Sequence, residues 1–139
     1  MSAFKKELSD EEKTTYMRAL LCVLGGKNSL SDEHKSYLKH QAEEIGMSAT
    51  EFRKVSSPKS TDELAKEIKK IGSVCLRRFI LREMIMLAIA DHEISDEEMK
   101  TIYAVGINAG IKEDKINDFF LWAAKGLEWQ LEGECLIEK

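Results

Sequence analysis

The segment AIADHEISDEEM, from Ala88 to Met99, gathers the side chains of this chain that are best suited to holding a metal ion. Carboxylate oxygens are the ligands that calcium and magnesium prefer, and carboxylate together with imidazole also suits zinc. Asp91 and Glu98 stand seven residues apart, and Glu93 lies between them. These three residues are therefore our candidate ligands for a weakly bound divalent cation, which would be calcium, magnesium or zinc.

The same residues also suit a purely structural role, which we favour. Glu98 can close a capping box on Ser95, and Ile94 can anchor the turn in the core. Asp91 fits this role least well, because it would follow the C-terminal end of a helix, where the macrodipole disfavours an anion. A shared cation would relieve that conflict, and so would hydrogen bonds from the N–H groups of the next helix.

Known calcium loops and catalytic sets do not fit the chain. In an EF-hand that closes at Glu98, Leu87 and Ile89 would occupy ligand positions, which excludes that motif. The sequence contains no glycine-flanked serine elbow, and LGGKNS, from Leu24 to Ser29, is too short for a phosphate loop. An enzyme that uses an acid pair for general acid–base chemistry therefore ranks last, and we expect a non-enzymatic protein.

Length and composition predict one domain, residues 1–139, in the cytoplasm. The net charge of −4 argues against a nucleic-acid partner. Glu63, Glu67 and Glu83 interrupt the one candidate basic set, which we interpret as a solvated helix face: Lys66, Lys69, Lys70, Arg77, Arg78 and Arg82. The most apolar run, 84–90, is far shorter than the roughly 20 residues of a membrane crossing, and no signal peptide is evident. The cysteines form no CxxC pair, so we expect buried thiols in a reducing compartment: Cys22, Cys75 and Cys135.

Helix-period patterns and helix-start signals dominate the chain and predict an all-α fold. Serine followed three residues later by glutamate marks capping boxes at Ser9, Ser48 and Ser95, and Ser31 carries a weaker form. The helix of residues 74–90 is apolar nearly all round after Glu83 and should run through the centre. The predicted helices lie near 10–24, 32–45, 49–55, 62–71, 74–90, 96–109 and 113–131.

An internal repeat relates two parts of the chain. SLSDEHKSYLKHQAEEIGM aligns without gaps on EISDEEMKTIYAVGINAGI at a constant offset of 64 residues. One copy cannot bury its own apolar face, so we predict a single compact bundle of about seven helices, built from two similar halves near residues 10–55 and 74–120. The aligned pairs include Leu38 with Ile102, and the two expected helix stops, Gly46 with Gly110.

With this repeat, the residues Ala90, Asp91, Ile94 and Glu98 resemble the signature of the tellurite-resistance TerB-like family. That signature is an alanine-aspartate-glycine turn, with a hydrophobic residue three positions after the aspartate and a glutamate seven after it. The N-terminal region of a membrane-anchored DnaJ-like co-chaperone is similar in the same way. The resemblance covers roughly residues 10–125, and it implies a compact helical domain, an acidic surface associated with divalent metal, and roles in stress response or protein association.

The chain departs from that signature at three positions. His92 replaces the glycine, and histidine tolerates the left-handed backbone conformation better than most residues. In the first repeat, Lys27 stands where Asp91 would be and His34 stands where Glu98 would be. A site that needs acids from both turns would lack its ligands from the first turn. Any bound cation therefore depends on the acids of the second turn.

The C-terminal part of the chain is rich in aromatic and apolar residues. Phe119, Phe120, Trp122 and Trp129 recur at helix spacing, and we interpret them as core packing. The extension of residues 127–139 carries further apolar residues, which either fold back onto the bundle or face a partner. The sequence therefore predicts an interaction module that docks a protein partner, and it leaves a homo-oligomer open. The alternative is a metal-dependent stress sensor.

Overall fold

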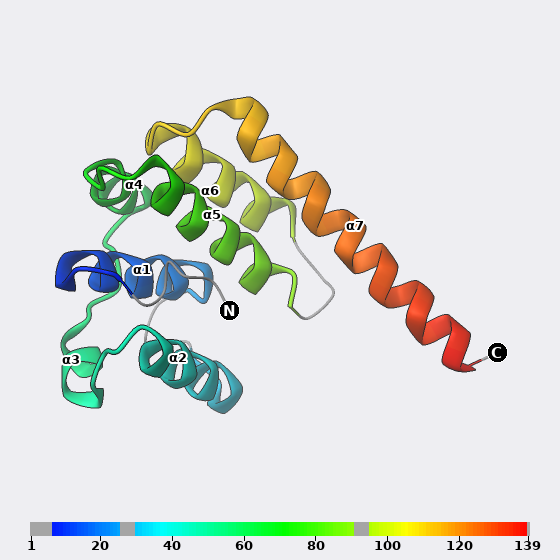
Figure 1. The fold of residues 1–139 in the computed structure, drawn as a ribbon, viewed down its shortest axis with the longest axis horizontal. Coiled ribbons are helices and arrows are strands. Elements are labelled where there is room, and N and C mark those ends of the chain that lie inside the picture. The colour runs from blue at the N-terminus through cyan, green and yellow to red at the C-terminus, as the bar shows by residue number, and fades with distance from the viewer. Residues whose placement is uncertain (1–6, 26–29, 91–94, 139) are drawn as a thin grey trace.

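The computed structural model describes residues 7–25, 30–90 and 95–138, and these form seven α-helices (Figure 1). No strand occurs within these ranges, so the predicted all-α class is confirmed. The predicted ranges match the observed ones to within about two residues, except at the last helix. In chain order the helices are α1 (Asp10–Val23), α2 (Asp32–Glu44), α3 (Ala49–Lys54), α4 (Thr61–Lys69), α5 (Val74–Ala88), α6 (Asp96–Asn108) and α7 (Glu113–Glu138).

Serine side chains begin the first six helices. In each, the serine hydroxyl oxygen accepts a hydrogen bond from the backbone N–H three residues later, which satisfies a free donor of the first turn. At Ser9 and Ser48 the predicted capping boxes are complete, because a glutamate carboxylate also accepts from the serine N–H. Ser60 and Ser73 cap helices that were predicted from periodicity alone. The six serines are Ser9, Ser31, Ser48, Ser60, Ser73 and Ser95.

Two helices end at glycines, as predicted. Gly46 after α2 and Gly110 after α6 have φ angles of 76° and 84°, in the left-handed region that favours glycine. In each turn, the N–H of the following residue donates to a carbonyl five residues back, at 2.8 Å and 3.0 Å respectively. These bonds satisfy carbonyl groups at the helix end, so both chain reversals have the same geometry.

The core lies between α1, α4, α5 and α6. α5 packs against α1, α6 and α7, and α4 packs against α1 and α6, while α2 joins the bundle through α1. The predicted central helix is thus α5, although Met86 on its outer face is exposed. Twelve large side chains are completely or almost completely buried: Tyr16, Met17, Leu20, Leu21, Leu38, Leu64, Ile68, Ile80, Leu81, Met84, Ile85 and Ile102.

Gly106 lets α6 lie close to the beginning of α7. A Cβ atom at this position would lie 2.8 Å from Ile116 Cδ1 and 3.3 Å from Leu81 Cδ2. Both distances are shorter than the roughly 3.5–4.0 Å of a favourable contact between carbon atoms, so a larger residue would push its neighbours away. Ile116 is fully buried, and its contact with Gly106 therefore helps to set the direction of α7.

The first three and the last three helices begin at corresponding residues. α1, α2 and α3 begin at residues 10, 32 and 49, whereas α5, α6 and α7 begin at residues 74, 96 and 113, which are each 64 residues later. α2 and α6 both have 13 residues. The third pair differs in length, because α3 has 6 residues and α7 has 26.

α7 is longer than the sequence analysis predicts. It continues to Glu138 rather than ending near 131, and Figure 1 shows its last turns projecting beyond the other helices. The C-terminal stretch is rich in leucine, glutamate and glutamine, which favour helix, so the extension does not fold back onto the bundle. Within the described ranges, no helix is both long enough and apolar enough to cross a membrane.

Candidate functional site

The predicted cation site lies at the turn before α6. Asp91 and Glu93 fall outside the described residues, so the structure places one of the three candidate ligands, Glu98. The Glu98 N–H donates to Ser95 Oγ (3.0 Å), and its carboxylate accepts from the Ser95 hydroxyl (3.1 Å). Glu98 thus takes part in the helix cap. Within the described ranges, no three His, Cys, Asp or Glu side chains gather closely enough to hold a metal ion.

A hollow of about 350 Å³ lies beside Glu98 and is lined by residues of α1, α5 and α6. Cys22 contributes to its wall, and burial raises the pKa of the Cys22 thiol. A thiol that stays protonated is a poor nucleophile and a poor metal ligand. The expectation of three buried thiols is wrong for the other two cysteines, because Cys75 begins α5 at the surface and Cys135 lies on the projecting end of α7.

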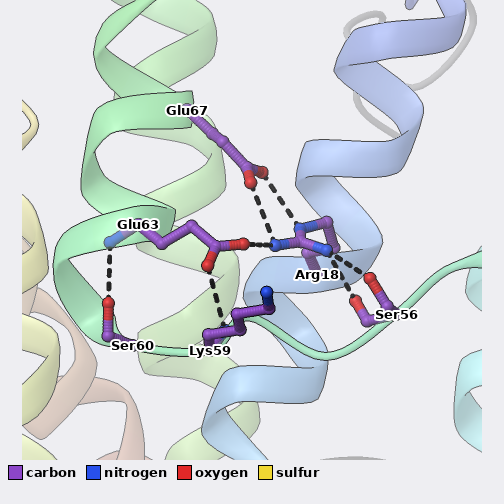
Figure 2. A network of polar contacts seen from close by, with 6 residues as sticks. All are labelled: Arg18, Ser56, Lys59, Ser60, Glu63 and Glu67. Atoms are coloured by element: carbon purple, nitrogen blue, oxygen red, sulfur yellow. Dashed lines mark hydrogen bonds and ion pairs between the residues drawn. The ribbon is translucent and has the colours of Figure 1, made fainter.

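Arg18 of α1 carries a buried guanidinium group that joins three parts of the chain (Figure 2). Its Nε donates to Glu67 Oε2 (3.1 Å), and its Nη2 contacts the carboxylates of both Glu63 and Glu67. Its Nη1 donates to the Ser56 carbonyl (3.1 Å) and to Ser56 Oγ (2.6 Å). The network therefore ties α1 to α4 and to the linker that connects α3 with α4.

The partners of Arg18 are themselves held in place. The Lys59 N–H donates to Glu63 Oε2 (3.3 Å), and the Glu63 N–H donates to Ser60 Oγ (3.1 Å), as Figure 2 shows. All five donors of the guanidinium have acceptors within the chain, so none is left for the open, polar hollow of about 670 Å³ between α1 and α4. We conclude that Arg18 stabilises the fold rather than binds a ligand.

Sequence reasoning missed this network, because it assigned Glu63 and Glu67 to a solvated helix face. The signal that identifies Arg18 is its setting inside the apolar run YMRALL of α1. Arg82, which lies 64 residues later, has a different environment. Its side chain is 36% exposed, against 10% for Arg18, and its Nε lies 3.4 Å from Glu83 Oε2. Its guanidinium also lies over the Phe79 ring, 5.2 Å from the centroid.

Two tyrosines, Tyr16 and Tyr37, have raised pKa values. The Tyr16 hydroxyl donates to Gln41 Oε1 (2.9 Å), and the Tyr16 ring stacks on Phe79 with centroids 5.8 Å apart. Burial raises the pKa of Tyr16 far above its ordinary value, and burial together with the charge of Glu83 raises the pKa of Tyr37 to about 12. Both hydroxyls are therefore protonated near neutral pH and cannot serve as a general base there.

Large apolar side chains remain exposed along α7. Trp122, Trp129 and Leu136 expose 49%, 75% and 81% of their surface. Core packing is therefore the wrong interpretation for the two tryptophans, whereas Phe119 and Phe120 do pack against the core. A monomer gains nothing from exposed groups of this size, so this surface is the strongest candidate for an interaction site.

Five exposed residues of α7 and the half-buried Phe119 follow a regular spacing. Steps of three and four residues alternate through Phe119, Trp122, Gly126, Trp129, Gly133 and Leu136. This spacing keeps the six residues on one side of a helix, and we call them the α7 seam. Two hollows of about 540 and 700 Å³ lie along the seam and share the residues Ala90, Trp129 and Gln130. The hollows therefore form one groove from the end of α5 to the tip of α7.

Comparisons with known proteins reveal no relative. No protein-family model matches the chain, and neither a curated protein nor a solved structure is significantly similar to it. The functional conclusion therefore depends on the residues of this chain.

Proposed function

We propose that this protein is a non-enzymatic interaction module that docks a protein partner through the α7 seam. The observation that supports this most strongly is the exposure of Trp122, Trp129 and Leu136 on a single face of a helix. Tryptophan is enriched at the centres of protein interfaces, because it buries a large apolar area at a small cost in side-chain entropy. Grooves of this kind accept an amphipathic helix, whose apolar residues enter the spaces between the exposed side chains.

The polar groups inside the bundle support a binding role over catalysis. The Arg18 donors are taken up by neighbouring helices, and the hydroxyl groups of Tyr16 and Tyr37 stay protonated. A catalytic site needs a nucleophile or a base close to a group that activates it, in a cavity that a substrate can enter. The described residues supply a saturated structural network instead, and the apolar surface lies elsewhere, on α7.

We further propose that the domain is TerB-like and is built from two similar halves, α1–α3 and α5–α7. Three observations support this. Helix starts recur at an offset of 64 residues, the serine caps Ser9 and Ser31 recur as Ser73 and Ser95, and the glycine turns after α2 and α6 have the same geometry. A role in the stress response accompanies this proposal, because the resemblance implies it.

Crosslinking in cells tests the docking proposal. A photo-crosslinking phenylalanine analogue is placed at Trp129 on the seam and, as the matched control, at Glu128, which is exposed and lies about 100° away around the helix. We expect discrete crosslinked products from position 129 and none of them from position 128. Equal labelling at both positions, or no product from either, would refute docking through the seam.

Metal-dependent sensing is the second proposed function, with a weak divalent cation bound by Asp91, Glu93 and Glu98. It is favoured by the position of the Glu98 carboxylate, which lies beside a hollow at the start of α6. Titration calorimetry and thermal melting with calcium, magnesium and zinc test it. We expect heat and a higher melting temperature with one of the ions, and loss of both in Glu98→Gln but not in the surface control Glu128→Gln. An absence of heat with all three ions rejects the site.

A further inference from the structure

We propose that the partner of the α7 seam is a second copy of this chain, whose own α7 lies antiparallel to the first. This inference rests on the proposed docking function and specifies its partner. It comes from the order of large and small residues along the seam, from the charges beside it, and from the area that remains exposed.

The seam is complementary to itself when the two helices run in opposite directions. A two-fold axis midway between residues 127 and 128 sets the register of the pair. Within the seam, two residues of different copies then lie opposite each other when their residue numbers add to 255. Trp122 then faces Gly133 of the second copy, Gly126 faces Trp129, and Phe119 faces Leu136. Each tryptophan therefore meets a glycine, and the outer layers pair two large apolar side chains. Alternation of large and small residues across facing positions is how packed layers interdigitate.

A parallel pair lacks this fit. In a parallel coiled coil each residue meets its own equivalent, so Trp122 would meet Trp122 and Gly126 would meet Gly126. The tryptophan layers would be overpacked and the glycine layers would leave voids, and both defects destabilise an interface. The sequence of the seam therefore selects the antiparallel arrangement.

The two glycines have no role within one copy that explains them. A Cβ atom at Gly126 or Gly133 would have no atom of the described chain within 4 Å, and neither glycine has a positive φ. Glycine in a helix interior costs roughly 1 kcal/mol relative to alanine. The space that a tryptophan of the second copy would fill accounts for glycine at both positions.

Charges beside the seam also match across the two-fold axis. Lys125 and Glu132 each precede a glycine of the seam and are exposed. In the antiparallel pair these flanking positions approach each other, so Lys125 of one copy lies nearest Glu132 of the other. The two-fold axis produces this attraction twice. On the opposite flank, Ala123 is buried in its own bundle and Gln130 carries no charge.

The exposed area is large enough for a stable pair. A tryptophan buries about 150–250 Å² in an interface, and the apolar groups exposed in two copies together offer on the order of 1,000 Å², the lower bound for a biological interface. These groups are Trp122, Trp129, Leu136 and Ile137. The distal part of α7 projects from the body (Figure 1), so the partner helix can lie beside it, with its tip near Met86 and Ile89 of the hollow beside α5.

Charge-reversal variants of the full chain test the antiparallel pairing. Light scattering should give a molar mass that rises with concentration to twice 15.8 kDa. Lys125→Glu and Glu132→Lys should each raise the dissociation constant roughly tenfold, because both variants convert two attractions into repulsions. An equimolar mixture of the two variants, and the double variant with both exchanges, should recover the dimer. The control Glu128→Lys, which lies outside the seam and its two flanks, should leave the dissociation constant unchanged.

A size variant tests the glycine–tryptophan layers without endangering the fold. Gly126→Leu introduces a side chain into open space in one copy, so the free energy of unfolding of the monomer should not fall. The same side chain would occupy the space of Trp129 from the second copy, so the variant should be monomeric at concentrations where the unaltered protein is a dimer. A dimer of unaltered strength in Gly126→Leu overturns the proposed layers.

The failure of this inference can be told apart from the failure of the docking function. If the protein is monomeric at every concentration but position 129 still forms a crosslinked product in cells, the second copy is rejected and docking to another protein stands. If the protein is monomeric and position 129 forms no product, both proposals are rejected. If the mixed charge variants fail to recover the dimer, the antiparallel register is wrong.

Discussion

The two parts of the molecule that begin at corresponding residues, α1–α3 and α5–α7, differ most where they end. α3 stops at Lys54, with Val55 extended and Pro58 close behind, and proline cannot continue a helix. α7 has no such stop and continues to Glu138. The added turns of α7 carry the exposed tryptophans. Because α7 does not stop where α3 does, the part α5–α7 presents an apolar surface in addition to its contribution to the core.

The two arginines at corresponding positions show a second difference. Arg18 is enclosed by Glu63, Glu67 and Ser56, whereas Arg82 lies over an aromatic ring and is one-third exposed. The neighbours cause this difference, because α4 covers α1 at Arg18 and supplies the two carboxylates. Arginines at corresponding positions can therefore differ, one enclosed in a polar network and the other partly exposed to solvent.

The core positions should give the largest effects, and they test whether the two parts are equally important for stability. Leu38→Ala and Ile102→Ala each remove a buried side chain, and each should cost about 2–5 kcal/mol of unfolding free energy. Chemical denaturation measures both values, with the more exposed Met99→Ala as the control. If only one of the two buried positions is sensitive, the similarity of the two parts does not extend to their packing.

Replacement of Arg18 and of Arg82 should change the free energy of unfolding by clearly different amounts. Arg18→Met leaves the carboxylates of Glu63 and Glu67 without their cation and should cost about 2–4 kcal/mol. Arg82→Met removes a partly exposed pair and should cost less than about 1 kcal/mol. Arg18→Lys should recover little, because an ammonium group cannot reproduce the planar set of donors. Equal losses at residues 18 and 82 would contradict a special role for the network.

The serine caps of α2 and α6 should contribute equally. Ser31→Ala and Ser95→Ala each remove the acceptor for an N–H group of the first turn, and each should cost about 1 kcal/mol in thermal or chemical unfolding. The matched variants Ser31→Gly and Ser95→Gly should cost only a few tenths of a kcal/mol. A much larger loss at Ser95 would indicate that the turn before α6 has a further role.

The smallest effect concerns the charge of one capping box. Hydrogen bonds from the Ser48 N–H and, to a smaller extent, with the Ser48 side chain lower the pKa of the Glu51 carboxyl below its ordinary 4.5. Because the folded state holds the ionised form, this contribution to stability is present above the unfolded pKa and is lost as the pH falls through the lowered folded value. NMR titration should give a Glu51 midpoint below 4.5 that rises in Ser48→Ala. A midpoint at or above 4.5 in the unaltered protein would contradict the box.

Local signals account for the parts of the fold that the sequence predicted well. Apolar residues at helix spacing, serine caps such as Ser9 and stops such as Gly46 act within a few residues, so they can be recognised without knowledge of the fold. The end of α7 was less predictable, because Gly133 disfavours helix while its neighbours favour it, and no single residue decides the outcome.

Contacts between distant residues account for what the sequence did not predict. Arg18 and Glu63 are 45 residues apart, and only the packing of α4 on α1 brings them together. The spacing of Trp122 and Trp129 is equally consistent with a buried and with an exposed helix face, since periodicity does not tell which face meets the core. For the candidate cation site, Glu98 does lie in the helix cap, but its carboxylate accepts from the Ser95 hydroxyl and does not complete the predicted capping box. The ligand role of Asp91, Glu93 and Glu98 stays a prediction.

The close approach of Ile116 to Gly106 fixes the direction of α7 near its beginning, so a small change in this contact would tilt the whole helix. From Ile116 to Leu136 the helix extends about 30 Å, so a tilt of about 10° at Ile116 displaces the far end by about 5 Å. That displacement is the width of a whole side chain, although the change at the contact is a fraction of an ångström. A residue buried in the bundle, which no partner touches, therefore governs where the exposed end of the helix points.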